Sequence, residues 1–122
     1  RRTIAQSKKT IRRNLSTCYY IHFKEIDVCG HDGDFKEKIK RLELLDKEFF
    51  SFVRNIPNTE LIVTGDHSTP CVRKRHTDDP VPLLWYGCGA DSVIEFNEKA
   101  CRRGSLGKMA GKDVLKRCGF DG

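Results

Sequence analysis

The segment "ELIVTGDHSTP", residues 60–70, joins a short apolar run to an acid and a histidine. The run at 60–64 is apolar and bounded by polar and turn-forming residues, which predicts a strand. Asp66 and His67 follow at once, so both lie where this strand ends. Because a carboxylate and an imidazole on consecutive residues can turn toward one point in a loop, this end of the strand is a candidate cation site.

The residues before this strand predict a long amphipathic helix. Apolar residues recur there at spacings of three and four, namely Phe35, Ile39, Leu42, Leu45, Phe49 and Val53. This spacing is typical of one helix face, and Asp34 is suited to cap its first turn. Pro57 and Asn58 then end the helix before the strand at 60–64 begins.

The rest of the chain extends this pattern into an α/β domain. A helix is expected at 3–15, a first strand at 18–23, a Gly- and Asp-rich loop at 24–33, a long loop at 65–80, a third strand at 81–86, and helices at 92–101 and 111–117. The order of strand, helix, strand, loop and strand predicts a parallel or mixed sheet. In such sheets, functional groups gather in the loops that follow the carboxyl ends of strands.

Composition limits the class of protein without choosing a function. The chain has 122 residues, 38% of them hydrophobic, which is enough for one domain with a core. Its formal charge of +6 favours anionic partners. No nucleic-acid module, signal peptide or membrane span is recognisable, so we expect neither a nucleic acid nor a membrane as partner. The six cysteines include no C-x-x-C pair, which predicts free thiols and a cytoplasmic location.

Three of the four histidines lie in the two predicted loops, each within a few residues of a carboxylate. Asp27 and His31 belong to "EIDVCGHDGD", residues 25–34, and His76 follows Asp66 and His67 in the next loop. Mixed oxygen and nitrogen ligands suit manganese, zinc, cobalt or iron, and five ligands suit two ions. A surface role for the histidines and a turn role for the aspartates remain an equal alternative on spacing alone.

Three long segments resemble the archaeal-type, cofactor-independent phosphoglycerate mutases, a branch of the alkaline phosphatase superfamily. They are "HFKEIDVCGHDGDFKEKIKRLELLDK" at 22–47, "IVTGDHSTPCVRKRHTDDPVPLLWYG" at 62–87 and "GSLGKMAGKDVL" at 104–115. They occur in the family's order and close to its spacing. The resemblance implies a partial alkaline-phosphatase-like α/β core, with a mostly parallel sheet and flanking helices.

The resemblance also implies an activity and a distribution of ligands. Asp27, His31 and His76 match the ligands of one ion, and Asp66 and His67 match ligands of a second. Manganese is the expected metal, with magnesium, cobalt or zinc as alternatives. The family interconverts 2-phosphoglycerate and 3-phosphoglycerate through a phosphorylated serine, in glycolysis and gluconeogenesis. Metal coordination lets such a serine lose its proton near neutral pH.

The sequence departs from a complete enzyme of this family. The nucleophilic serine, an aspartate of the second metal site and the cap domain all precede the matched region in the family. We therefore expect residues 1–122 to be the carboxyl-terminal segment of the catalytic core, inactive without the remainder of its own chain. Ser68 follows the second metal pair but does not match the family's nucleophile, and no substrate-binding residue can be assigned.

Several alternatives remain open. Another superfamily member, such as a phosphatase or a homoserine-kinase-like protein, would share the ligands, and a noncatalytic metal-binding protein would need no serine. The basic run at 73–75 can steer an anionic substrate, and Lys24 can contact phosphate, although both are typical of solvated positions. Cys29 and Cys71 stand beside proposed ligands but are more simply bystanders.

Overall fold

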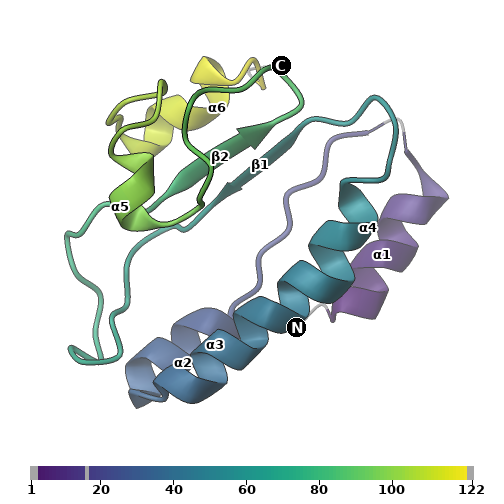
Figure 1. The fold of residues 1–122 in the computed structure, drawn as a ribbon. Helices are drawn as coiled ribbons and strands as arrows, with labels where there is room; N and C mark the ends of the chain where they lie inside the picture. Colours follow the sequence, from purple (N-terminus) through teal and green to yellow (C-terminus); the bar gives the residue numbers. More distant parts are fainter. Residues whose placement is uncertain (1–2, 16, 121–122) are drawn as a thin grey trace. The chain divides into compact units, whose positions relative to one another are not determined.

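A computed structural model describes residues 3–15 and 17–120 of the chain, in two compact units. Unit 1 combines Arg1–Pro57 with the loop Thr69–Thr77, and unit 2 combines Asn58–Ser68 with Asp78–Gly122. Helices dominate the first unit, whereas the second holds a strand pair and short helices (Figure 1). None of the helices within the described ranges is long and apolar enough to cross a membrane.

Unit 1 is built from α1 (Ile4–Arg13), α2 (Glu25–Asp32), α3 (Phe35–Leu44), the π-helical segment η1 (Leu45–Phe50) and α4 (Ser51–Val53). The last three follow one another without a break, so the long helix predicted at 35–53 is confirmed. Its predicted cap is also confirmed, because the Asp34 carboxylate accepts a hydrogen bond from the backbone N–H of Glu37 at 3.0 Å.

The Gly- and Asp-rich stretch at 24–33 is a helix, so its prediction as a loop was wrong. Residues 25–32 form α2, which packs against α3, and Gly33 ends it with φ +72°. A left-handed glycine is the usual residue after a helix, and here it turns the chain sharply from α2 into α3. Packing against α3 therefore outweighs the weak helix propensity of Asp and Gly.

The predicted first strand at 18–23 does not form in the described part of the chain. The only ladder there joins β1 (Leu61–Thr64) and β2 (Leu83–Tyr86), which run antiparallel with Leu61 opposite Tyr86. Both strands were predicted, but the expectation of a mostly parallel sheet is not met among these residues. The physical reason is that no crossover helix separates β1 from β2, and parallel neighbours need one.

The core of unit 1 lies at the carboxyl-terminal half of the long helix. Leu45, Phe49 and Val53 are buried, and Phe23 packs edge-on against Phe49 with ring centroids 5.0 Å apart. The amino-terminal half of the same apolar stripe is exposed, with Phe35 at 57%. The apolar stripe is therefore buried where other elements cover η1, and α1 is one of these elements (Figure 1).

Unit 2 adds α5 (Glu98–Cys101), the 3-10 turn η2 (Gly111–Asp113) and α6 (Val114–Arg117) to the strand pair. The helix predicted at 111–117 is confirmed as η2 and α6, whereas only the last turn of the one predicted at 92–101 is helical. Asn97 explains this late start, because its side chain accepts from the backbone N–H of Ala100 at 2.8 Å and caps α5.

Asp91 lies in the part of the predicted helix that is not helical, and its carboxylate connects two loops. One carboxylate oxygen accepts from the backbone N–H of Val93 at 2.9 Å, and the other from that of Ser105 at 2.8 Å. These hydrogen bonds, the one from Ser105 first, hold the pKa of the Asp91 carboxyl below its usual value. The ionised carboxylate therefore fastens residues 91–93 to the turn after α5.

This bridge predicts a pH dependence. Since the folded-state pKa of Asp91 is lowered, its contribution to stability is complete above the unfolded pKa of about 3.9 and disappears as pH falls through the folded value. We expect Asp91→Asn to lower the thermal unfolding midpoint at pH 6 and to change it less near pH 2. Asp46→Asn, at an exposed position of η1, is the control. Equal effects of Asp91→Asn at both pH values would refute the bridge.

Candidate metal centre

Two of the predicted ligands lie on one face of α2. Asp27 and His31 are four residues apart on this helix, a spacing that places their side chains side by side. The Asp27 carboxylate oxygen Oδ1 lies 3.4 Å from Nε2 of His31. The helical conformation of this segment, which was not predicted, is therefore what brings the two groups together.

His76 joins them from the loop Thr69–Thr77 of the same unit. Its Nε2 lies 3.4 Å from Oδ1 of Asp27 and 3.1 Å from Nε2 of His31. Among the residues that the structure describes, these three form the group of potential metal ligands whose donor atoms lie within 4.8 Å of one another. The two histidines are exposed, whereas the Asp27 side chain is only 14% exposed.

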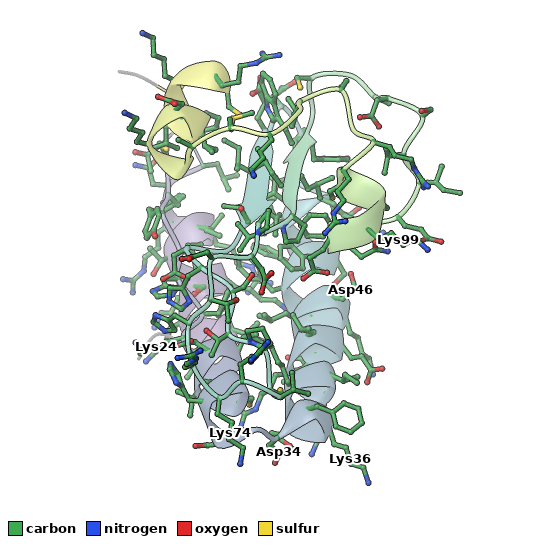
Figure 2. The ribbon with its side chains drawn as sticks, turned by 90° about the vertical axis from the view of Figure 1, so that its left-hand side faces the viewer. Lys24, Asp34, Lys36, Asp46, Lys74 and Lys99 are labelled. Atoms are coloured by element: carbon green, nitrogen blue, oxygen red, sulfur yellow. The ribbon has the colours of Figure 1, made fainter. Side chains whose placement is uncertain are left out.

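The backbone at Lys74 orients the His31 ring. Nδ1 of His31 lies 3.2 Å from the Lys74 carbonyl oxygen, and a carbonyl only accepts, so Nδ1 carries the proton. In the neutral ring, this leaves the Nε2 lone pair directed at the other two donor atoms. Lys74 has φ +53°, a conformation that non-glycine residues rarely adopt, and its side chain lies against Gly33 beside Asp34 (Figure 2).

The three donor atoms fit a divalent ion. Metal–ligand bonds of about 2.0–2.2 Å at octahedral or tetrahedral angles place neighbouring donors about 2.8–3.6 Å apart. The observed separations of 3.1, 3.4 and 3.4 Å agree with this spacing. In addition, two neutral imidazole nitrogens that face each other need a proton or a cation between them. One carboxylate and two imidazoles could therefore hold such an ion together.

Two side chains contact Asp27, and the sequence predicted neither contact. The Thr69 hydroxyl donates to Oδ1 of Asp27 at 2.7 Å, and Nζ of Lys24 lies 3.9 Å from Oδ2. Nζ of Lys38 in turn donates to the Thr69 carbonyl at 2.9 Å. Thr69 is buried, with 5% of its surface exposed. In the sequence it is an ordinary threonine before a proline, so only the fold reveals its contact.

Gly30 allows this loop to reach α2. A Cβ at position 30 would lie 2.3 Å from the Thr69 carbonyl oxygen and 2.9 Å from its methyl carbon. Both distances are too short for real contacts, so any side chain at position 30 would push the loop away. A glycine between Asp27 and His31 is therefore a steric requirement of the centre.

We expect Gly30→Ala to destabilise unit 1 by about 1–3 kcal/mol, as overpacking does, and to weaken metal binding. The steric clash involves backbone, which cannot rotate out of the way. Gly111→Ala is the matched control, because a Cβ at position 111 meets nothing within 4 Å. Chemical denaturation and metal titration of both variants check this expectation, and equal behaviour of the two would contradict it.

The second predicted pair, Asp66 and His67, lies in unit 2. Nε2 of His67 is 3.3 Å from Oδ2 of Asp66, and the backbone N–H of His67 donates to Oδ1 of Asp66 at 3.1 Å. Ser68 follows them, and its hydroxyl donates to the Asp79 carbonyl at 3.1 Å.

The remaining candidates contribute less to the centre. All six cysteines are free thiols. Cys29 is buried, and burial raises the pKa of its thiol, which disfavours the thiolate that binds soft metals. The Cys71 thiol lies 3.8 Å from the Cys29 carbonyl oxygen. The basic run at 73–75 is exposed, as expected for a solvated loop.

The sequence and the fold both have known relatives. The model of the Metalloenzyme superfamily matches residues 1–120. A 2,3-bisphosphoglycerate-independent phosphoglycerate mutase of Pyrobaculum neutrophilum is 43% identical over 98 residues, which cover 79% of this chain and 24% of the relative. A probable enzyme of the same name from Thermosipho africanus is 41% identical over 117 residues, which cover 93% of this chain and 29% of the relative.

A solved structure, that of the PH0037 protein from Pyrococcus horikoshii, matches with a TM-score of 0.86 and 31% sequence identity. The match covers 95% of this chain and 37% of that one. The chain thus spans about a quarter of the length of the curated relatives that it matches. The family model extends over nearly all of the sequence, and the fold agrees with a partial alkaline-phosphatase-like α/β core. This chain therefore belongs to the Metalloenzyme superfamily.

Proposed function

We propose that Asp27, His31 and His76 bind one divalent metal ion in a 2,3-bisphosphoglycerate-independent phosphoglycerate mutase, of which residues 1–122 form the carboxyl-terminal segment. The observation that carries this proposal is the convergence of the three donor atoms at 3.1–3.4 Å. The names of the relatives from Pyrobaculum and Thermosipho support the choice of reaction. Manganese is the proposed metal, in keeping with the mixed carboxylate and imidazole ligands.

Each residue has a defined part in this proposal. The Asp27 carboxylate supplies charge, and the two imidazoles supply neutral nitrogen ligands. When bound, the ion would polarise a phosphoryl oxygen and stabilise the charge that develops during transfer. Asp66 and His67 are proposed ligands of a second ion, and a serine upstream of the matched region is the proposed nucleophile. The cytoplasmic location and the role in glycolysis remain predictions.

The basic groups near the centre favour an anionic substrate such as phosphoglycerate. Nζ of Lys24 lies 3.9 Å from Oδ2 of Asp27, and residues 73–75 add positive charge to the loop that carries His76. Cationic side chains beside a metal raise the local concentration of a phosphate ester and help to orient it.

The experiment that tests this function is an assay of the complete natural polypeptide with 2-phosphoglycerate, before and after chelation. We expect 3-phosphoglycerate to form, to cease with the chelator and to return with Mn²⁺. Release of inorganic phosphate without isomerisation would favour a phosphatase, and ATP-dependent phosphorylation of homoserine a kinase-like relative. Metal binding without any of these reactions would favour a noncatalytic protein.

A further inference from the structure

The Thr69 hydroxyl makes the shortest hydrogen bond of the candidate centre, and its partner is the proposed ligand Asp27. It lies 2.7 Å from Oδ1 of Asp27, the same oxygen that faces both histidines at 3.4 Å. A carboxylate oxygen has two lone-pair directions, so Oδ1 can accept from Thr69 and still present the other lone pair to a metal. The hydroxyl therefore fixes which oxygen of Asp27 faces the cluster.

Thr69 is itself held in place from two sides. Its carbonyl accepts from Nζ of Lys38 on α3, and its methyl carbon lies against Gly30 on α2. The residue is buried, so its rotamer cannot change without disturbing this packing. A hydrogen-bond donor that packing has already oriented aligns a ligand at little further entropic cost.

We propose that Thr69 is a positioning residue that aligns Asp27 for metal binding and couples α2 to the loop that carries His76. This inference rests on the metal site proposed above. Thr69 begins the segment Thr69–Thr77 of unit 1, and His76 lies near the end of the same segment. One hydrogen bond thus connects the two parts of the chain that supply the ligands. Loss of such a supporting contact typically lowers metal affinity by about 10–100-fold.

The test is a calorimetric titration of the complete natural polypeptide with Mn²⁺, in which the binding step lost in His31→Ala identifies the site. Thr69→Val keeps the shape and the methyl group but removes the hydroxyl, and we expect it to weaken this step by about 10–100-fold. Thr69→Ser keeps the hydroxyl and loses the methyl group at Gly30, and we expect it to bind within roughly threefold of the natural protein.

A second comparison isolates the same hydroxyl if the valine variant does not fold. Thr69→Ala and Thr69→Ser both lack the methyl group and differ only in the hydroxyl, so the alanine variant should bind about 10–100-fold more weakly than the serine variant. Circular dichroism at the titration temperature establishes that each variant is folded. Equal weakening by valine and serine would show a packing role and overturn the proposal, as would unchanged affinity in valine or alanine. Absence of any step that depends on His31 would overturn the metal site itself.

Discussion

Replacing His31 by alanine in the complete natural polypeptide is expected to lower turnover in the proposed mutase reaction by about a thousandfold or more, with little change in stability. The imidazole is exposed and makes its contacts with Asp27, His76 and the Lys74 carbonyl, so its removal leaves no cavity in the core. A metal ion contributes several kcal/mol to a phosphoryl-transfer transition state, and roughly 4 kcal/mol corresponds to this factor. Steady-state turnover at saturating Mn²⁺ measures the effect.

Three further variants test this expectation. His22→Ala also removes an exposed histidine, from a segment outside the cluster, and should retain turnover within about threefold. Asp27→Asn keeps the size of the side chain but removes the charge, and should resemble His31→Ala. Asp66→Ala, at the second pair, should also abolish activity. Near-normal turnover in both His31→Ala and Asp66→Ala would show that the assignment of the ligands is wrong.

The largest effect on stability is expected at Phe49. Its ring is 4% exposed and packs against Phe23 at 5.0 Å and Phe50 at 5.6 Å, both with edge-to-face geometry. Phe49→Ala would remove these contacts and leave a cavity beside η1, which typically costs about 3–5 kcal/mol. Denaturant unfolding of the complete natural polypeptide, followed by a probe in unit 1, measures this loss.

Phe35→Ala is the control, because it removes the same ring from the same long helix at a position that is 57% exposed. We expect its free energy of unfolding to change by less than about 1 kcal/mol. A loss at Phe35 equal to that at Phe49 would mean that the amino-terminal half of the apolar stripe is also buried in the natural protein. Such a result would contradict the location of the core at η1.

Local patterns predicted the elements whose side chains alternate or recur regularly. The period of three and four gave the helix at 35–53 and its Asp34 cap, and apolar runs gave β1 and β2. Regular patterns reflect burial of one face, which the sequence encodes directly. The relative direction of the two strands could not be predicted from the sequence, because it depends on the path of residues 65–82 between them.

The segment at 24–33 shows where local rules fail. Gly30 and Gly33 suggested a loop, yet only Gly33 ends a helix. Gly30 lies within α2, at the point where the Thr69 backbone packs against this helix. A close contact between segments distant in sequence is invisible to propensity. Thr69 has no sequence signature either, so its contact with Asp27 could not be predicted from the sequence.

The candidate centre was predicted in part. Resemblance to the mutase family, and not spacing, grouped His76 with Asp27 and His31, which are 49 and 45 positions before it. The structure places these three side chains together, while their role as metal ligands remains a prediction. The orienting carbonyl of Lys74 and the hydroxyl of Thr69 required the fold, because hydrogen bonds across such separations depend on tertiary packing.

Anomalous diffraction from crystals of the complete natural polypeptide grown with Mn²⁺ tests the metal site most directly. We expect a manganese peak about 2.0–2.3 Å from Oδ1 of Asp27, Nε2 of His31 and Nε2 of His76. A crystal in which manganese occupies other sites, while these three side chains remain without a peak between them, would contradict the assignment.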